Sequence, residues 1–515
     1  MPLMPQILQP GPARARALAV GVPGATAFVL ALWHLDRGTM WRDEAATVMA
    51  ASRTLPQLWH LLGTVDAVHG LYYLLMHFAL PLYPGEFMLR LPSALGASAT
   101  ACLVAALGMR LVRLRVGLWA GLLYAIAPFA QYYAQEGRSY ALVAAGAAAA
   151  TLLLVRCVER PSARNWAGYA AAVTVTAWLH EFAVLLLAAH AVTLAVTGVP
   201  PRLWRRWCAA AGCAALLLLP LAAVTRDQSG QVSWIRPPGR AEAETLLRAA
   251  TGHDGLLYAV TLALIALAVS RPPVRRTRGA CGLAGVAVPL ALVPPLILFA
   301  VSQWHPLYAP RYALFAFAGV PLLAAAGLEA LLARVPRPAR GARLLSGAVP
   351  ALAGAGLVAV AFLVQLPLQQ HQRSADARRD DLGSVARMLS AQLEPGAALL
   401  YLPKAGRRYV EAYPASVAGV RDVSLRASGA ASGTLYGTDV PPRELAARMA
   451  CLSRVQVLFD AEAGRPGWHT DSTGERAKLA VLRRDFVSLT QVRRRSGLLV
   501  LYARVGGPAR GCADR

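Results

Sequence analysis

The stretch RLVRLR, Arg110–Arg115, decides how this chain is folded. It holds three arginines in six residues, and it stands between two apolar runs near residues 91–110 and 116–134. A membrane helix needs about 20 apolar residues, and short loops that are rich in Lys and Arg stay on the cytoplasmic side. The stretch therefore predicts two membrane helices joined by a cytoplasmic loop.

The rest of the chain repeats this alternation of apolar runs and short basic clusters. Of its 515 residues, 56% are hydrophobic and 15% are charged, and the mean hydropathy is +0.45, which is too apolar for a soluble protein. We expect eleven spans, near residues 17–35, 91–110, 116–134, 139–156, 165–179, 182–200, 207–225, 255–270, 279–301, 312–333 and 344–366. The fold class is therefore an all-α, multi-pass membrane protein over residues 1–366.

The eleven spans place every basic cluster on one side of the membrane. Arg14 and Arg16 precede the first span, and further clusters lie at 110–115, 156–164, 202–206, 271–278 and 334–343. We therefore expect the N-terminus in the cytoplasm. The net charge of +25 comes largely from these clusters, so it indicates membrane topology and not nucleic acid binding.

One apolar segment, LYYLLMHFALPLY at residues 71–83, is too short for a span. Counting it as a span would put RLVRLR outside and reverse every later loop. We therefore expect it to be a helix in the outer interface, where its aromatic residues suit the depth. It belongs to an outer loop, residues 36–90, between the first two spans.

After Leu366 the composition becomes mixed and polar. Short β-like runs lie at 397–403, 454–460 and 497–505, with helical stretches at 380–392 and 442–449 between them. We expect a small α/β domain, residues 367–515, outside the cytoplasm. Two cysteines, Cys451 and Cys512, fall in it, and an oxidising compartment would permit a disulfide.

Most unusual polar residues fall on the predicted outer face, at the ends of separate spans. They are Asp43, Glu44, His69, Tyr72, Glu136, Arg138, Tyr140, His180, Glu181, Arg311 and Tyr312. Ionisable residues at membrane depth are costly and often functional. Because these residues come from separate segments and share one face, we expect several spans to enclose a cavity there.

Each of these residues also has a purely structural interpretation. Asp43 and Glu44 could form a solvated acidic turn, and Glu136 could pair with Arg138 at a helix end. His180 could simply pack within the bundle, as we expect for His190. Arg311 could anchor a lipid headgroup. The convergence of acids, arginines and histidines on one face favours a functional site.

The chemistry of this set fits transfer of a sugar from a lipid-linked phosphate. A carboxylate can take the proton of an acceptor hydroxyl, and arginines can bind and stabilise a leaving phosphate. Neither a P-loop nor a credible dinucleotide fingerprint is present in the sequence, so an ATP-driven transporter or an NAD enzyme is disfavoured. Glu136, His180 and Glu181 leave a divalent metal open, although their spacing does not demand one.

An ordered set of motifs resembles the GT-C membrane glycosyltransferases. The motifs are the acid pair after the first span, His69 followed by Leu71-Tyr72, RLPSAL at Arg90–Leu95, the E-x-R-x-Y-A-L junction at Glu136–Leu142, and the Arg311–Tyr312 pair. The nearest branch is that of bacterial proteins similar to protein O-mannosyltransferases and to lipid A aminoarabinose transferases, glycosyltransferase family 39. The resemblance covers residues 17–340.

The resemblance implies an inverting transfer from a polyprenyl-phosphate sugar, with mannose as the first candidate, to a hydroxyl at the outer face of a bacterial plasma membrane. It implies that Asp43 is the base that activates the acceptor, supported by Glu44, and that Arg138 and Arg311 bind the donor phosphate. The remaining residues would shape the pocket: His69, Tyr72, Glu136, Tyr140, His180, Glu181 and Tyr312. The acceptor would be a cell-envelope glycan, a lipid or a protein.

Two other classes of function stay open at this point. A transporter or flippase of lipid-linked sugars should carry polar residues near the bilayer midplane, often within inverted repeats, whereas here the polar set is at one end and we find no repeat. A non-catalytic envelope protein would use the tail to bind a partner. Replacing Asp43 with Asn separates these classes, because only a transferase would lose its activity.

Overall fold

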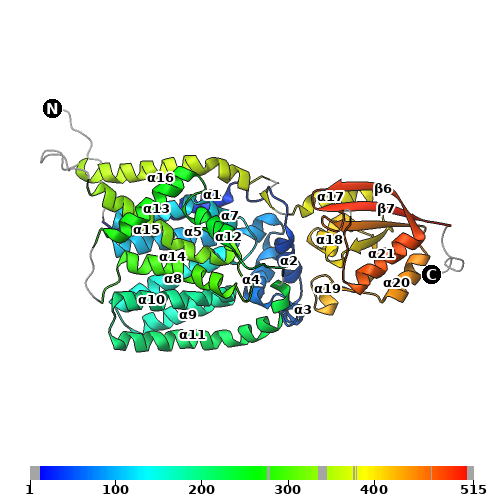
Figure 1. The fold of residues 1–515 in the computed structure, drawn as a ribbon, viewed down its shortest axis with the longest axis horizontal. Helices are drawn as coiled ribbons and strands as arrows, with labels where there is room; N and C mark the ends of the chain where they lie inside the picture. The colour runs from blue at the N-terminus through cyan, green and yellow to red at the C-terminus, as the bar shows by residue number, and fades with distance from the viewer. Residues whose placement is uncertain are drawn as a thin grey trace. The chain divides into compact units, whose positions relative to one another are not determined.

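The computed structural model describes residues 12–232, 234–274, 279–334, 345–374, 377–378, 380–465 and 467–506. Most of the predicted basic loop at 334–343, part of the loop at 271–278, and Cys512 lie outside the described residues. The described part is mostly helical, with a small mixed sheet near the C-terminus (Figure 1). It confirms a polytopic membrane protein that carries a small C-terminal α/β region.

The described chain divides into two compact units. We call the first the membrane unit, Met1–Leu35 with Arg90–Gln372, and the second the sheet unit, Asp36–Leu89 with Arg373–Arg515. The segment between the first two long helices thus packs with the distant C-terminal segment. Two parts of the chain that are far apart in sequence form one body.

The described residues of the membrane unit form helices and the loops that join them. Its helices are α1 (Pro12–Leu32), α5 (Glu86–Leu111), α6 (Leu114–Ile126), α7 (Pro128–Ala134), α8 (Tyr140–Glu159), α9 (Ala163–Leu179), α10 (Leu185–Thr197), α11 (Pro201–Asp227), α12 (Arg240–Thr251), α13 (Gly255–Ser270), α14 (Leu283–Val301), α15 (Gly319–Leu332) and α16 (Leu345–Gln372), with 3₁₀ segments η3 (Glu181–Val184), η4 (Ser229–Val232) and η5 (Pro310–Ala318). Helix α8 packs against α9, and α9 packs against α11 (Figure 1). Helix α15 packs against both α13 and α14.

Every predicted span overlaps helix in the described residues, although residue 344, where the last one was expected to begin, lies outside them. Eleven full spans is too high a number by length and composition. In the described residues, seven helices are long and apolar enough to cross a membrane, or eight if the bent pair α12 and α13 is one span. Three predicted spans, 116–134, 165–179 and 182–200, fall on shorter helices. Ala127 before Pro128 is extended, because a proline disfavours helix at the preceding residue. His180 is also extended, and its backbone ends α9.

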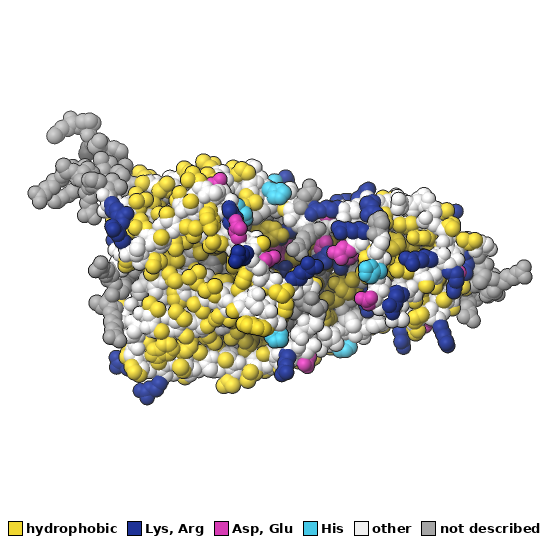
Figure 2. Space-filling model, viewed as in Figure 1, with side chains coloured by type: hydrophobic (Ala, Val, Ile, Leu, Met, Phe, Trp, Pro, Cys, Tyr) yellow, Lys and Arg dark blue, Asp and Glu magenta, His cyan; other side chains and the backbone are white. Residues whose placement is uncertain are grey.

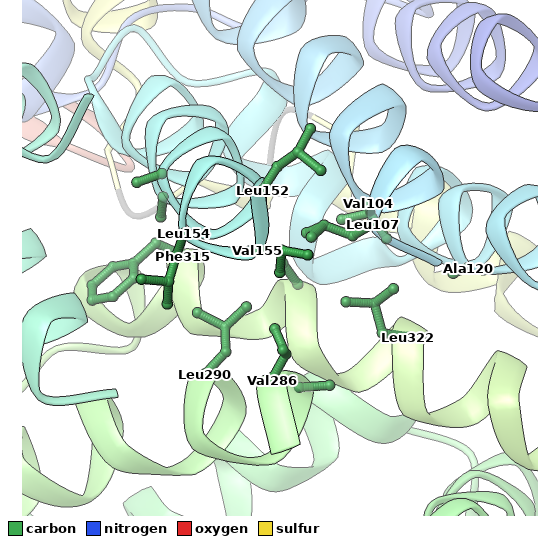
Figure 3. Close-up of a cluster of buried hydrophobic side chains, with 14 of the residues drawn as sticks. Val104, Leu107, Ala120, Leu152, Leu154, Val155, Val286, Leu290, Phe315 and Leu322 are labelled. Atoms are coloured by element: carbon green, nitrogen blue, oxygen red, sulfur yellow. The ribbon is translucent and has the colours of Figure 1, made fainter. Parts of the chain in front are cut away.

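The core of the membrane unit is built from branched and small side chains. Figure 3 shows one part of it, where five helices and η5 contribute Val104, Leu107, Ala120, Leu152, Leu154, Val155, Val286, Leu290, Phe315 and Leu322. Helices α13 and α15 approach closely at Gly327, where an added Cβ would lie 1.9 Å from the carbonyl oxygen of Leu264. Close approach through small residues is typical of helices that pack in lipid.

The outside of this unit is apolar as well. Leu216, Leu217 and Leu219 on α11 are each at least half exposed, and Figure 2 shows hydrophobic side chains spread over the visible face of the unit. Such a surface would be unfavourable in water and suits a hydrocarbon environment. The chain is a multi-pass integral membrane protein.

The sheet unit combines short helices with two sheets. Its elements are α2 (Arg42–Ala51), α3 (Leu55–Leu62), η1 (Ala67–His69), α4 (Gly70–Ala79), η2 (Leu80–Leu82), α17 (Leu382–Gln392), β1 (Ala398–Leu402), η7 (Lys404–Arg407), α18 (Arg408–Ala412), η8 (Pro414–Val417), β2 (Arg421–Asp422), β3 (Leu425–Ala427), α19 (Gly429–Ser432), β4 (Thr438–Asp439), α20 (Pro442–Ala450), β5 (Arg454–Asp460), α21 (Thr473–Asp485), β6 (Phe486–Arg494) and β7 (Gly497–Arg504). The larger sheet has the order β2-β1-β5-β7-β6. β1 is parallel to β2 and β5, and β7 is antiparallel to β5 and β6.

The predicted strands and helices of the tail are confirmed at β1, β5, β7, α17 and α20. Strand β6 was not predicted, because most of its side chains are exposed and the sequence shows no buried face. The segment 71–83 is helical, as α4 and η2. Cys451 is disulfide-bonded, and the five other cysteines of the described chain are free.

Candidate functional site

The junction between α7 and α8 is held in place by buried hydrogen bonds. Gln135 Nε2 donates to the carbonyl oxygens of Ala31 at 2.8 Å and Trp33 at 2.7 Å, at the end of α1. Ser93 Oγ of α5 donates to the Arg138 carbonyl oxygen at 2.8 Å. The junction is thus fixed to both the first and the second long helix.

Ionisable side chains from this junction, and from the break between α9 and η3, are buried inside the protein. Glu136 is 1% exposed and Arg138 is 5% exposed. His180, at the break between α9 and η3, is 4% exposed. Burying charge in a membrane protein is costly unless it is paired or has a function. The structure therefore brings the predicted junction residues together in the interior of the membrane unit.

An aromatic group surrounds His180. The ring centroids of His180 and Tyr312 are 4.8 Å apart, those of His180 and Tyr140 are 5.7 Å apart, and those of Phe182 and Tyr312 are 5.2 Å apart. The segments η3, η5 and the first turn of α8 supply these rings. Residues from three predicted motifs thus meet in one cluster.

The guanidinium of Arg311 lies over this cluster. Its central carbon is 5.2 Å from the ring centroid of Tyr312, 5.9 Å from that of Tyr140 and 5.8 Å from that of Trp234, which are cation–π distances. Arg138 lies two residues before Tyr140, whose ring contacts that of His180. The two predicted phosphate-binding arginines therefore belong to segments that meet at His180.

The space inside the cluster is small. Tyr140, His180, Arg311 and Tyr312 line it together with Val143, Ala183 and Phe315, and its volume is about 10 Å³. That is about the space one water molecule needs. A phosphate group would therefore have to displace side chains of this cluster.

Two of the predicted residues lie elsewhere. Glu181 accepts a hydrogen bond of 2.6 Å from Thr225 Oγ1 of α11, so its carboxylate is directed toward that helix. His190 lies 2.9 Å from the Tyr169 hydroxyl and 3.1 Å from Thr151 Oγ1, which confirms that it packs between helices. The described residues contain no group of three His, Cys, Asp or Glu side chains that could hold a metal, so Glu136, His180 and Glu181 do not assemble as a ligand set.

The acidic pair lies in the sheet unit, in the first turn of α2. Asp43 is half-buried, and Glu44 is completely buried. Carboxylates are favourable in this position because the amide dipoles of a helix leave positive charge at its N-terminus. The acids are thus part of an ordered helix, and the solvated-turn interpretation is wrong for Glu44.

His69 and Tyr72 are both buried beside α4. The Tyr72 hydroxyl donates to the Leu89 carbonyl oxygen at 3.4 Å, and the ring of His69 is 6.0 Å from that of Tyr73. Tyr73 in turn donates to Asp66 at 2.8 Å. The predicted pocket residues of the outer loop form part of a packed wall.

Sequence reasoning missed several residues of these sites. The ring centroid of Tyr133 is 5.9 Å from that of Tyr140, and Phe182 follows Glu181. Both could have been found by their aromatic character alone, whereas Trp234 lies in a loop that gave no signal. Tyr436 was also missed: burial raises its pKa, Arg408 lowers it, and the charges of Asp66 and Asp43 raise it further. The phenol of Tyr436 therefore lies within electrostatic reach of Asp43.

Comparisons with known proteins identify the fold. No family model matches the chain, and no curated protein matches it in sequence. The crystal structure of ArnT from Cupriavidus metallidurans in the apo state matches with a TM-score of 0.58 at 13% identity, over 93% of this chain and 97% of that one. The same protein bound to undecaprenyl phosphate matches with a TM-score of 0.55 at 13% identity, over 95% and 98%. The expected GT-C fold is confirmed over nearly the whole chain.

Proposed function

We propose that this chain is an inverting membrane glycosyltransferase that moves a sugar, with mannose as the first candidate, from a polyprenyl-phosphate donor to an acceptor hydroxyl. One observation carries the proposal: the guanidinium of Arg311 lies over the rings of Tyr140 and Tyr312, which contact His180, in a fold similar to that of ArnT. ArnT has been crystallised with undecaprenyl phosphate. Arg138 is buried two residues before Tyr140, and arginines are suited to binding a phosphate group.

In the proposed reaction, Asp43 accepts the proton of the acceptor hydroxyl while the acceptor oxygen attacks the anomeric carbon of the sugar. The bond between that carbon and the phosphate oxygen breaks, and polyprenyl phosphate leaves with the electron pair. Arg138 and Arg311 stabilise the charge that develops on the phosphate. Glu44 supports Asp43, whose proton returns to solvent after transfer.

The other predicted residues are proposed to shape the substrate pocket. Tyr140, His180 and Tyr312 would line the donor side with Glu136, and His69 and Tyr72 would form the wall near the base. Glu181 would contribute at the rim, where it bonds Thr225. A divalent metal is not needed for the proton and phosphate steps in this scheme.

We also propose the placement of the chain in the cell. The N-terminus would be cytoplasmic in a bacterial plasma membrane, with a catalytic domain at 1–366 and an extracytoplasmic domain at 367–515. The disulfide at Cys451 supports this placement, because disulfides persist in oxidising compartments. The acceptor would then be a cell-envelope glycan, lipid or protein.

The test uses purified protein in proteoliposomes with radiolabelled polyprenyl-phosphate-mannose and a cell-envelope extract. Wild type should release label from the lipid, and Asp43→Asn should reduce release by at least about 100-fold, because the acceptor hydroxyl loses its base (a positioned base gives about 10²–10⁴-fold). Asp36→Asn is the matched control, since Asp36 is an exposed acid of the same loop. Equal release by wild type and Asp43→Asn would remove Asp43 from the mechanism. Silence of wild type across a panel of lipid-linked sugars would reject the transferase and favour a transporter.

A further inference from the structure

Three residues just before Asp43, namely Thr39, Met40 and Arg42, form hydrogen bonds with the C-terminal segment. Thr39 Oγ1 donates to Asp381 Oδ1 at 2.6 Å, and Met40 N donates to the Tyr413 hydroxyl at 2.9 Å. Leu382 N donates to the Met40 carbonyl oxygen at 3.1 Å. Both main-chain and side-chain groups of the approach to α2 are therefore held by residues more than 300 positions away in sequence.

The strongest of these attachments is between Arg42 and Asp380. Arg42 Nε lies 2.6 Å from Asp380 Oδ2, and Arg42 Nη2 lies 3.0 Å from Asp380 Oδ1. This is the two-point geometry in which an arginine binds a carboxylate best. Asp380 is 7% exposed, whereas the side chain of Arg42 is 44% exposed. We call this Arg42–Asp380 pair, which links α2 to the C-terminal segment, the joint.

Asp380 also caps the helix that bears the catalytic acids. The N-cap residue of α2 is Trp41, whose side chain makes no capping hydrogen bond. Asp380 Oδ2 instead accepts from the backbone N–H of Arg42 at 3.3 Å, at the first position of α2. A carboxylate at this position satisfies an N–H that a helix start leaves unbonded. Asp380, from the C-terminal segment, thus provides the capping hydrogen bond that the side chain of Trp41 does not make.

The anchor for this joint is itself rigid. Asp381 is the N-cap of α17, and its side chain accepts from Ser384 N at 2.9 Å. Tyr413 donates its hydroxyl hydrogen to Glu86 Oε1 at 2.7 Å. The residues that hold Thr39 and Met40 are therefore each fixed by a second bond, and the start of α2 has little freedom to shift.

We propose that Asp380 is a positioning residue for the reaction, which sets the place of the Asp43 carboxylate by fixing the start of α2 through Arg42. Asp43 follows Arg42 directly, so any change at the first turn of α2 moves its carboxylate. A displacement of about 1 Å in a catalytic group can cost about 100-fold in rate. This gives the C-terminal domain a role in catalysis, and it rests on the proposed function of Asp43.

The experiment measures transfer by full-length Asp380→Asn and Asp380→Ala in proteoliposomes, with kcat and the KM for the lipid donor determined separately. We expect kcat to fall at least tenfold in Asp380→Asn and further in Asp380→Ala, with the donor KM within twofold of wild type. Asp485→Asn is the matched control, because Asp485 pairs with Arg484 and Arg504 on α21 and β7 and does not touch α2. A fall in donor affinity with unchanged kcat would overturn the proposal.

A charge swap tests whether the effect passes through Arg42. Arg42→Asp alone should be as slow as Asp380→Ala, and the double variant Arg42→Asp/Asp380→Arg should recover at least fivefold over it. Full recovery is not expected, because arginine at position 380 cannot accept from the backbone N–H at position 42. No recovery would reject positioning through the ion pair. Should Asp380→Ala fail to fold, Asp380→Asn carries the test, since it keeps the size of the side chain.

A second readout does not depend on activity. Hydrogen exchange of a peptide covering residues 39–51 should be faster in Asp380→Asn than in wild type, and unchanged in Asp485→Asn. If wild type transfers no sugar but exchange rises, the proposed function fails and the joint stands. If wild type is active and Asp380→Asn matches it in both rate and exchange, the proposed function stands and the positioning role is rejected.

Discussion

The two ends of the membrane unit bury the same residue types in different ways. Helix α8 begins at Tyr140 and ends at Glu159, so these residues mark opposite ends of a 20-residue helix. At the Glu159 end, Arg115 binds Glu329 at two points, 2.6 Å each, and Arg113 reaches the same carboxylate at 3.1 Å. At the Tyr140 end, the guanidinium of Arg311 lies over aromatic rings.

Arg115 and Arg311 thus contact different groups. A carboxylate that binds a guanidinium at two points fixes its direction and offsets its charge. Each ring face contributes about 0.5–2 kcal/mol and sets no single direction. In the proposed function, Arg311 binds the donor phosphate, whereas Arg115 has a structural role.

The largest expected effect is on transfer by arginine variants at the two ends. Arg138→Ala and Arg311→Ala should each lower the rate of sugar release at least 100-fold, because the leaving phosphate loses a charge-assisted partner. Arg115→Ala should stay within threefold of wild type per folded molecule. Rates in proteoliposomes check this, and an Arg115→Ala as slow as Arg311→Ala would break the distinction between the ends.

The second expected effect is on stability and has the opposite pattern. Glu329 is 1% exposed, so Glu329→Ala leaves Arg115 without its partner inside the protein. The Arg115 side chain is 25% exposed, so water replaces part of the lost interaction, and we expect a loss of about 1–3 kcal/mol, which should appear as a fall in the thermal midpoint in detergent. Tyr312→Leu at the other end should lower the midpoint much less. Equal falls would mean that the ring contacts are as structural as the ion pair.

The smallest effect is expected at a buried polar group between the two ends. His190→Leu removes bonds to Tyr169 and Thr151, but the Tyr169 hydroxyl still accepts from Trp207 Nε1 at 3.1 Å, and Thr151 still donates to the Ala147 carbonyl oxygen at 2.8 Å. We expect a loss of about 1 kcal/mol of stability and no change in transfer. A loss of transfer in His190→Leu would show that residues needed for catalysis are not confined to the Tyr140 end of the membrane unit.

The sequence was sufficient to predict most of the helices and the grouping of the junction residues. Apolar runs and arginine clusters report directly on the bilayer, so helix positions followed from them. Glu136, Arg138, Tyr140, His180 and Arg311 stood out because ionisable groups are rare at membrane depth. Span length was less predictable, because breaks at Ala127 and His180 depend on local backbone geometry.

Long-range pairing could not be predicted. Nothing around Arg42 in the sequence indicates that its partner is Asp380, because an arginine followed by acids has many possible partners. Trp234 joined the Arg311 cluster from a loop whose path depends on tertiary packing. The grouping of residues 36–89 with the C-terminal segment is also a tertiary property, since composition places the boundary of the tail only after Leu366.

The hydrogen bonds of Gln131 and Gln135 have a consequence for how the protein is made. The last carbonyl groups of a helix have no partner within it, and in hydrocarbon each unsatisfied group costs several kcal/mol. Gln135 Nε2 donates to the carbonyl oxygens of Ala31 and Trp33 at the end of α1. One turn earlier, Gln131 Nε2 donates to the Ala27 carbonyl oxygen at 3.3 Å. The carbonyl oxygens of Ala31 and Trp33 therefore gain these hydrogen bonds only once α7, about a hundred residues later in the chain, has packed against the end of α1.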